Sequence, residues 1–107
     1  MIPPPKAPDE TGLIACQKQL DRFFAAYPNP TLNTRAVKAL RFLATGEKPF
    51  AGKPEGWAAG VIYAVANLDR RACGVPGLLN SELTEFFGVT METIRRRAAH
   101  VVNGISI

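Results

Sequence analysis

Ten consecutive residues, from Trp57 to Ala66, carry no charged side chain, and their only polar side-chain groups are the indole N–H of Trp57 and the hydroxyl of Tyr63. A helix needs about 20 such residues to cross a bilayer, so a run of this length is typical of a buried core helix. Pro54 stands where a helix begins readily, because the first turn leaves its amide donors unused. A helix that is apolar on every side belongs in the middle of a bundle. We therefore predict a central helix over residues 54–72.

Gly60 interrupts this apolar segment. Inside a helix glycine is less favourable than alanine by about 1 kcal/mol. Its small neighbours Ala58, Ala59 and Ala64 would allow another helix to approach closely. We therefore expect Gly60 to serve helix packing.

Two amphipathic helices are predicted before the central one, over residues 11–27 and 31–45. In the first, apolar residues recur at steps of three and four, which indicates one buried face; they are Leu13, Cys16, Leu20, Phe23, Phe24 and Tyr27. Thr11 is its expected N-cap, and Pro28-Asn29-Pro30 is expected to end it. The inner stripe expected for the second comprises Val37, Leu40 and Leu43, with Ala36 and Ala44 beside them.

A single domain accounts for the 107 residues, of which 47% are hydrophobic. Four prolines within residues 1–10 predict a flexible tail, and residues 11–107 are predicted to form one all-α bundle. No apolar signal segment follows the N-terminus, so a cytoplasmic protein is expected. Cys16 and Cys73 form no Cys-x-x-Cys pair and are interpreted as small buried apolar residues.

The most informative segment for function is residues 79–97. Residues 80–87 and 90–103 are predicted as two helices that form a helix-turn-helix, with Gly88 as the left-handed corner. Asn80 or Ser81 is the expected N-cap of the first helix and Thr90 that of the second. Ile94 is expected to face the core, and Gly104 is expected to end the last helix.

The start of the last helix holds the candidate DNA-binding residues, which are Thr90, Met91, Glu92, Thr93, Arg95 and Arg96. Met91, Glu92, Arg95 and Arg96 are expected to point outward. An arginine there bonds a phosphate or the edge of a guanine, whereas Glu92 would repel phosphate. An alternative interpretation stays open, in which the two helices merely close the bundle and their arginines form a solvated face.

The distribution of charge argues against a strong, stand-alone DNA binder. The net charge of +4 lies in residues 1–53, which hold eight Lys or Arg and four Asp or Glu. Residues 54–107 hold five of each sign and are neutral overall. A protein gains most of its affinity for DNA by neutralising phosphates. Residues 54–107, which carry no net positive charge, would therefore contribute little affinity.

Two family resemblances rest on the sequences Trp57-Ala58-Ala59-Gly60-Val61-Ile62-Tyr63-Ala64 and Gly88-Val89-Thr90-Met91-Glu92-Thr93-Ile94-Arg95-Arg96-Arg97. Together they resemble the cyclin-like repeat of transcription factor IIB. They are also similar to an uncharacterised bacterial domain family in which a Trp-Ala-Ala-Gly helix precedes a helix-turn-helix. The first resemblance implies a five-helix cyclin-like bundle and an approach of Thr90, Thr93, Arg95 and Arg97 to a DNA backbone or a protein partner. A single repeat without a zinc ribbon does not imply a role in basal initiation.

Catalysis is not expected from this sequence. His100 is the only histidine, and no nucleophile, base and orienting group can be assembled around it. No metal site, no cofactor and no membrane partner is expected. Two functions are predicted: a DNA-binding module, with a homodimer as one way to gain affinity, or a protein-interaction module with a cyclin-like groove and no direct DNA contact.

Overall fold

The computed structural model describes residues 10–44, 52–67, 75 and 77–105. These residues form five α-helices: α1 (Glu10–Ala26), α2 (Pro30–Leu43), α3 (Pro54–Asn67), α4 (Asn80–Phe87) and α5 (Met91–Ile105). No strand occurs among them, so the predicted all-α architecture is confirmed. The predicted extension of the central helix over 68–72 and residues 1–9 of the expected tail lie outside the described residues, as does Cys73.

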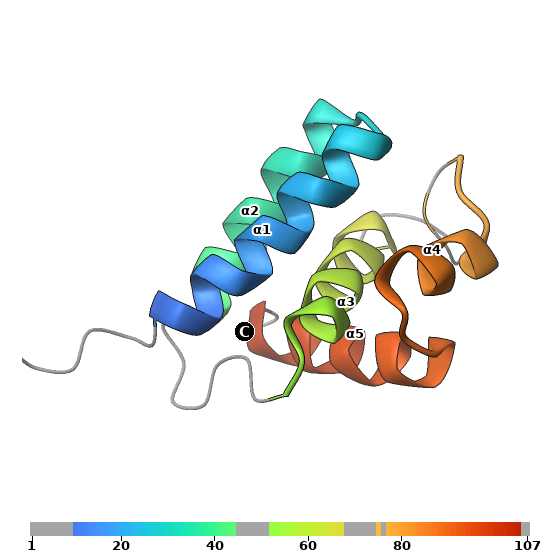
Figure 1. Ribbon diagram of the computed structural model, residues 1–107. Coiled ribbons are helices and arrows are strands. Elements are labelled where there is room, and N and C mark those ends of the chain that lie inside the picture. Colours follow the sequence, from blue (N-terminus) through green and yellow to red (C-terminus); the bar gives the residue numbers. More distant parts are fainter. Residues whose placement is uncertain (1–9, 45–51, 68–74, 76, 106–107) are drawn as a thin grey trace, which may run out of the picture.

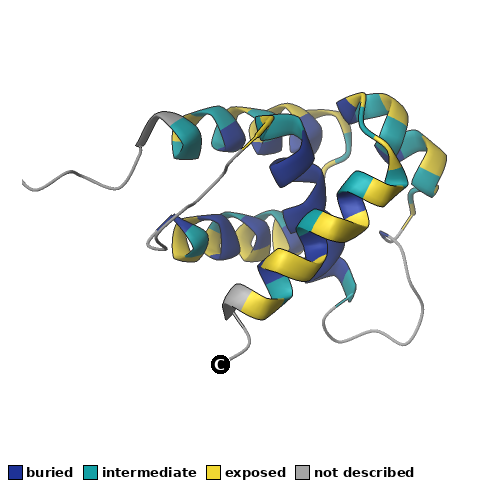
Figure 2. Cartoon of the chain, turned by 90° about the horizontal axis from the view of Figure 1, so that it is seen from below, coloured by how far each residue is buried: buried dark blue, intermediate teal, exposed yellow. Residues whose placement is uncertain are grey.

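The helices are arranged around α3 (Figure 1). α1 and α2 lie side by side as a hairpin that packs against α3, and α5 crosses α3 and also contacts α2. Every residue of α3 from Gly56 to Ala66 is buried, which Figure 2 shows as a dark blue helix inside the bundle. The prediction of a central apolar helix is confirmed. None of the described helices is long and apolar enough to cross a membrane.

α3 and α5 approach each other closely at Gly60. A Cβ atom built on Gly60 would lie 2.5 Å from Cβ of Arg97 and 3.1 Å from the backbone nitrogen of Ala98. One turn earlier, a Cβ on Gly56 would lie 3.3 Å from Cγ2 of Thr93. Two glycines four residues apart on α3 therefore allow α5 to pack closely against this helix. Gly60 has the packing role that was expected of it.

An aromatic cluster joins α1 to α4. The ring of Phe23 stacks on Phe87 with centroids 5.6 Å apart and meets Phe86 edge-on at 5.5 Å. The guanidinium carbon of Arg22 lies 4.3 Å from the centroid of Phe86, and its Nη2 donates to the carbonyl of Phe86 at 3.3 Å. α4 is thus attached to α1 through rings and one cationic side chain.

Several predicted helix ends differ from the observed ones. Thr11 is not an N-cap, because α1 already includes Glu10. α2 begins at Pro30 and is capped by Asn29, whose Oδ1 accepts the amide of Leu32 at 3.1 Å. The buried side of α2 consists of Leu32, Ala36, Ala39 and Leu40, so Val37 and Leu43 of the expected stripe are only half-buried.

Neither Asn80 nor Ser81 caps α4. The preceding residue, Leu79, is extended, and its amide donates to Oε1 of Glu82 at 3.0 Å, so Asn80 is already the first helical residue.

Gly104 does not end α5, which continues to Ile105. Glycine permits a left-handed stop but does not impose one.

The turn between α4 and α5 depends on Gly88. Its backbone is left-handed, with φ 66° and ψ 34°, and its amide donates to the carbonyl of Thr84 at 2.8 Å. Val89 also donates to this carbonyl, at 3.2 Å. The predicted glycine corner is confirmed, and residues 81–102 are two helices rather than one continuous rod.

Cys16 is fully buried between α1 and the rest of the core. Desolvation first, and then the negative charge of Glu55, raise the pKa of its thiol from 9.0 to about 12. Its interpretation as a small buried apolar residue is confirmed.

Replacing Gly60 with alanine should lower the free energy of unfolding by about 2 kcal/mol, because the new methyl group must displace the backbone of α5. Gly56→Ala is the matched control: it adds the same methyl group on the same helix, where the nearest atom, Cγ2 of Thr93, is 3.3 Å away and no backbone atom is met. It should change stability much less. Urea unfolding measures both variants. A Gly60→Ala protein more stable than wild type, as helix propensity alone predicts, would contradict this packing.

Gly88→Ala should cost about 1 kcal/mol of stability through the backbone alone, since a Cβ there meets no atom within 4 Å and φ is positive. Gly88→Asn should cost less, because asparagine tolerates this conformation better. Thermal unfolding compares the two variants. Equal stability of all three proteins would contradict a left-handed corner.

The raised pKa of Cys16 predicts a pH dependence of stability. Above about pH 9 the unfolded chain releases the thiol proton while the folded chain retains it, so rising pH favours unfolding. The stability difference between wild type and Cys16→Ala should therefore fall with pH, by at most about 1.4 kcal/mol per pH unit. Urea unfolding between pH 8 and about 10.5 tests this. Both proteins retain Cys73, whose titration cancels; parallel pH profiles would contradict the prediction.

Candidate nucleic-acid interface

One face of α5 is exposed from Glu92 to Asn103. Its buried side is formed by Ile94, Ala98 and Val101. Residues on the opposite side are exposed at the three- and four-residue spacing of a helix and appear yellow in Figure 2; they are Glu92, Arg95, Arg96, Ala99, His100 and Asn103. The predicted anchoring role of Ile94 is confirmed. Arg95 and Arg96 are both on the solvent side, where the sequence analysis placed them.

Thr90 caps α5 as predicted. Its Oγ1 accepts the backbone amide of Thr93 at 3.2 Å and donates to Oγ1 of Thr93, also at 3.2 Å. This pair of bonds satisfies one of the amides that a helix start leaves open. The hydroxyl of Thr93 keeps its own proton for another acceptor.

Two of the six candidate DNA-binding residues are less exposed than residues on a DNA-binding face should be. Met91 was expected to point outward, but it is half-buried and packs against the core cluster. Its position at the first residue of α5 brings it toward the bundle, next to the turn. Thr93 is half-buried as well, because its methyl group faces Gly56 of α3. Thr90, Glu92, Arg95 and Arg96 are exposed.

Arg97 lies between α5 and α3. Its guanidinium carbon is 4.5 Å from the ring centroid of Trp57, a cation–π contact, and the imidazole of His100 lies 6.0 Å from the same ring. Arg97 Nε is buried without a hydrogen-bond partner in the described part of the chain. Desolvation and then the charge of Arg96 lower the pKa of Arg97 below its usual value. A bound anion would therefore stabilise the charged form of Arg97.

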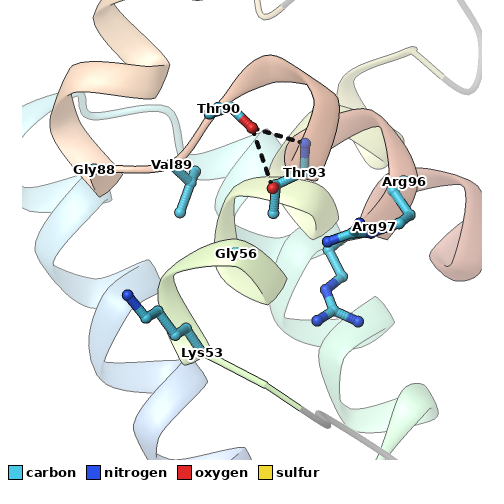
Figure 3. Close-up of a pocket in the computed structure, with 8 residues that line it drawn as sticks. All are labelled: Lys53, Gly56, Gly88, Val89, Thr90, Thr93, Arg96 and Arg97. Carbon is cyan, nitrogen blue, oxygen red and sulfur yellow. Dashed lines mark hydrogen bonds between the residues drawn. The ribbon is translucent and has the colours of Figure 1, made fainter.

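A pocket of about 310 Å³ opens where the start of α3, the α4–α5 turn and the first turns of α5 meet (Figure 3). Three of the side chains that line it are cationic: Lys53, Arg96 and Arg97. Figure 3 shows Lys53 and Arg97 on either side of Gly56, with Thr90 and Thr93 above them. The remaining lining residues are Gly56, Gly88, Val89, Thr90 and Thr93.

Lys53 and Gly56 were not predicted from the sequence to belong to this region. Both precede the apolar run of the central helix, and nothing in their own spacing links them to residues 90–97. The available signal was the pair Gly56 and Gly60 at four-residue spacing, which marks the side of α3 that another helix crosses. Lys53 lies at the entrance to that crossing, since it comes just before the first turn of α3.

No group of three or more metal-binding side chains occurs among residues 10–44, 52–67, 75 and 77–105. Comparisons of the chain with protein-family models, with curated proteins and with solved structures give no match.

Proposed function

We propose that α4 and α5 act as a helix-turn-helix and that this protein is a non-enzymatic module that binds duplex DNA through the N-terminal part of α5. The observation that carries the proposal is the exposed face of α5, on which Arg95 and Arg96 stand side by side while Ile94 anchors the helix below. A helix presented in this way fits the major groove, and guanidinium groups near its start bond phosphates or guanine edges.

The turn supports the proposal through its rigidity. Gly88 is left-handed, Thr90 caps the helix that follows, and the close contact at Gly60 fixes the position of α5 against α3. A recognition helix must be held firmly if its side chains are to select a register on DNA. Five helices with an apolar third one in the middle also agree with the proposed kinship to the cyclin-like repeat of transcription factor IIB.

The local charge around α5 is more favourable to DNA than the neutral C-terminal half suggests. Lys53 belongs to the positively charged N-terminal half by sequence, yet it lines the same pocket as Arg96 and Arg97. Glu92 offsets part of this charge on the exposed face. We therefore propose moderate affinity, which a second copy of the protein on a neighbouring half-site would raise.

A second candidate function is protein binding on the outer side of the α1–α2 hairpin. Ile14 and Phe42 are large apolar residues that remain 53% and 45% exposed. A hollow of about 430 Å³ beside Ile14 also includes Lys18, Asp21 and Arg41, a mixture of apolar and charged side chains that suits a protein partner. On this proposal the α5 face makes no direct contact with DNA.

Titration of a labelled duplex at about 50 and 200 mM salt separates the two functions. Under DNA binding, wild-type affinity should fall steeply with salt. The Arg95→Ala/Arg96→Ala double variant should bind roughly tenfold or more weakly, with a salt slope reduced by about two, because two phosphate or base contacts are lost.

The matched control is Lys38→Ala/Arg41→Ala, which removes the same charge from exposed positions on α2. This control should lose little affinity. Absence of duplex binding by wild type at the lower salt concentration would reject the DNA proposal. An equal loss of affinity in both double variants would mean that the protein binds DNA only through its net charge and not through the α5 face.

A further inference from the structure

The pocket beside the start of α5 lies next to the face proposed to enter the DNA groove. Arg96 contributes to both, since it is exposed on α5 and also lines the pocket. The pocket therefore adjoins the place where a sugar–phosphate strand would pass if α5 bound DNA. The inference that follows rests on that proposed function.

The lining of the pocket is suited to an anion. Lys53, Arg96 and Arg97 bring three positive charges to it, and no carboxylate is among the residues that line it. The nearest acids in sequence, Glu55 and Glu92, do not line the pocket, and Glu92 is on the exposed face of α5.

Two of the residues that line the pocket carry hydrogen-bond donors without an acceptor among the described residues. Arg97 Nε is buried without a partner in the part of the chain that the structure describes. The hydroxyl of Thr93 accepts a bond from Thr90 and keeps a proton to donate. A buried donor without an acceptor costs free energy, and an oxygen of a bound anion would recover it.

We infer that this pocket holds a phosphate group of the DNA backbone, bound by Lys53, Thr93, Arg96 and Arg97. Oxygens of the phosphate accept from the guanidinium and hydroxyl donors, while the ammonium of Lys53 supplies charge from the opposite side of Gly56. Contacts of this kind fix the register of a recognition helix without reading sequence. Lys53 is a positioning residue on this account, and it belongs to the segment before α3 rather than to the recognition helix.

The shape of the pocket depends on two glycines, Gly52 and Gly56, that lie near Lys53. A side chain at Gly56 would enter the floor of the pocket, and a Cβ on Gly52, which has φ +102°, would lie 2.5 Å from Nη2 of Arg97. The glycines around Lys53 thus leave room for the guanidinium of Arg97 at the edge of the pocket.

Lys53→Ala tests the inference, because Lys53 is exposed and its removal leaves the helix contacts intact. Its affinity for duplex DNA should fall roughly fivefold, to a similar extent for unrelated sequences, with a salt slope reduced by about one. The matched control is Lys38→Ala, which removes the same charge from an exposed position on α2 that lines neither this pocket nor the hollow beside Ile14. Circular dichroism shows whether both variants are folded as wild type is.

The outcomes separate this inference from the proposed function. If wild type binds DNA and Lys53→Ala behaves as Lys38→Ala does, the phosphate pocket is wrong while DNA binding by α5 stands. If wild type does not bind DNA, both proposals are overturned. A selective loss in Lys53→Ala, with Arg95→Ala showing a further and independent loss, supports both.

A second measurement identifies the source of the phosphate. Trp57 is the only tryptophan and lies beneath Arg97, so its fluorescence reports on the guanidinium. Duplex DNA should change Trp57 emission in wild type, and excess inorganic phosphate should compete with it. A response to inorganic phosphate that DNA neither produces nor displaces would assign the pocket to a free phosphorylated ligand and overturn the backbone contact. No response to either would overturn it as well.

Discussion

The contact between the backbone of α3 at Gly60 and the backbone of α5 at Arg97 is the constraint on which the rest of this structure depends. Only a residue without a Cβ allows this approach, because any added atom would overlap Arg97. The approach fixes both the depth and the direction of α5 against the central helix. It also brings Arg97 over Trp57 and Thr93 against Gly56, so the pocket is a by-product of how two helices pack.

Structural features that are determined by residues close together in the sequence were predictable. The apolar run Trp57–Ala66 implied a central helix, and the spacing of aromatic and aliphatic residues implied the buried face of α1. The corner at Gly88 and the cap at Thr90 followed from backbone sterics and hydroxyl chemistry. In each of these cases the residue type alone restricts the backbone or the burial strongly enough to decide the outcome.

The errors arose where two local solutions compete or where the partner lies far along the chain. Asn80 and Ser81 are good caps, but the carboxylate of Glu82 already serves the amide of Leu79, so the helix starts earlier than a cap search indicates. The motif predicts that Met91 points outward, whereas its burial depends on how α5 packs against the core. Lys53 could not be connected with Arg96 and Arg97 without knowing where α5 crosses α3.

The attachment of α4 differs in kind from that of α5. α5 is seated mainly on α3, whereas α4 is a short helix tied to α1 by the rings of Phe86 and Phe87 and by Arg22. Leu83 and Phe87 of α4 nevertheless belong to the same buried core as Ile94 of α5. Detaching α4 would expose these core residues, so its amides should exchange with solvent mainly through opening events that also involve the rest of the bundle.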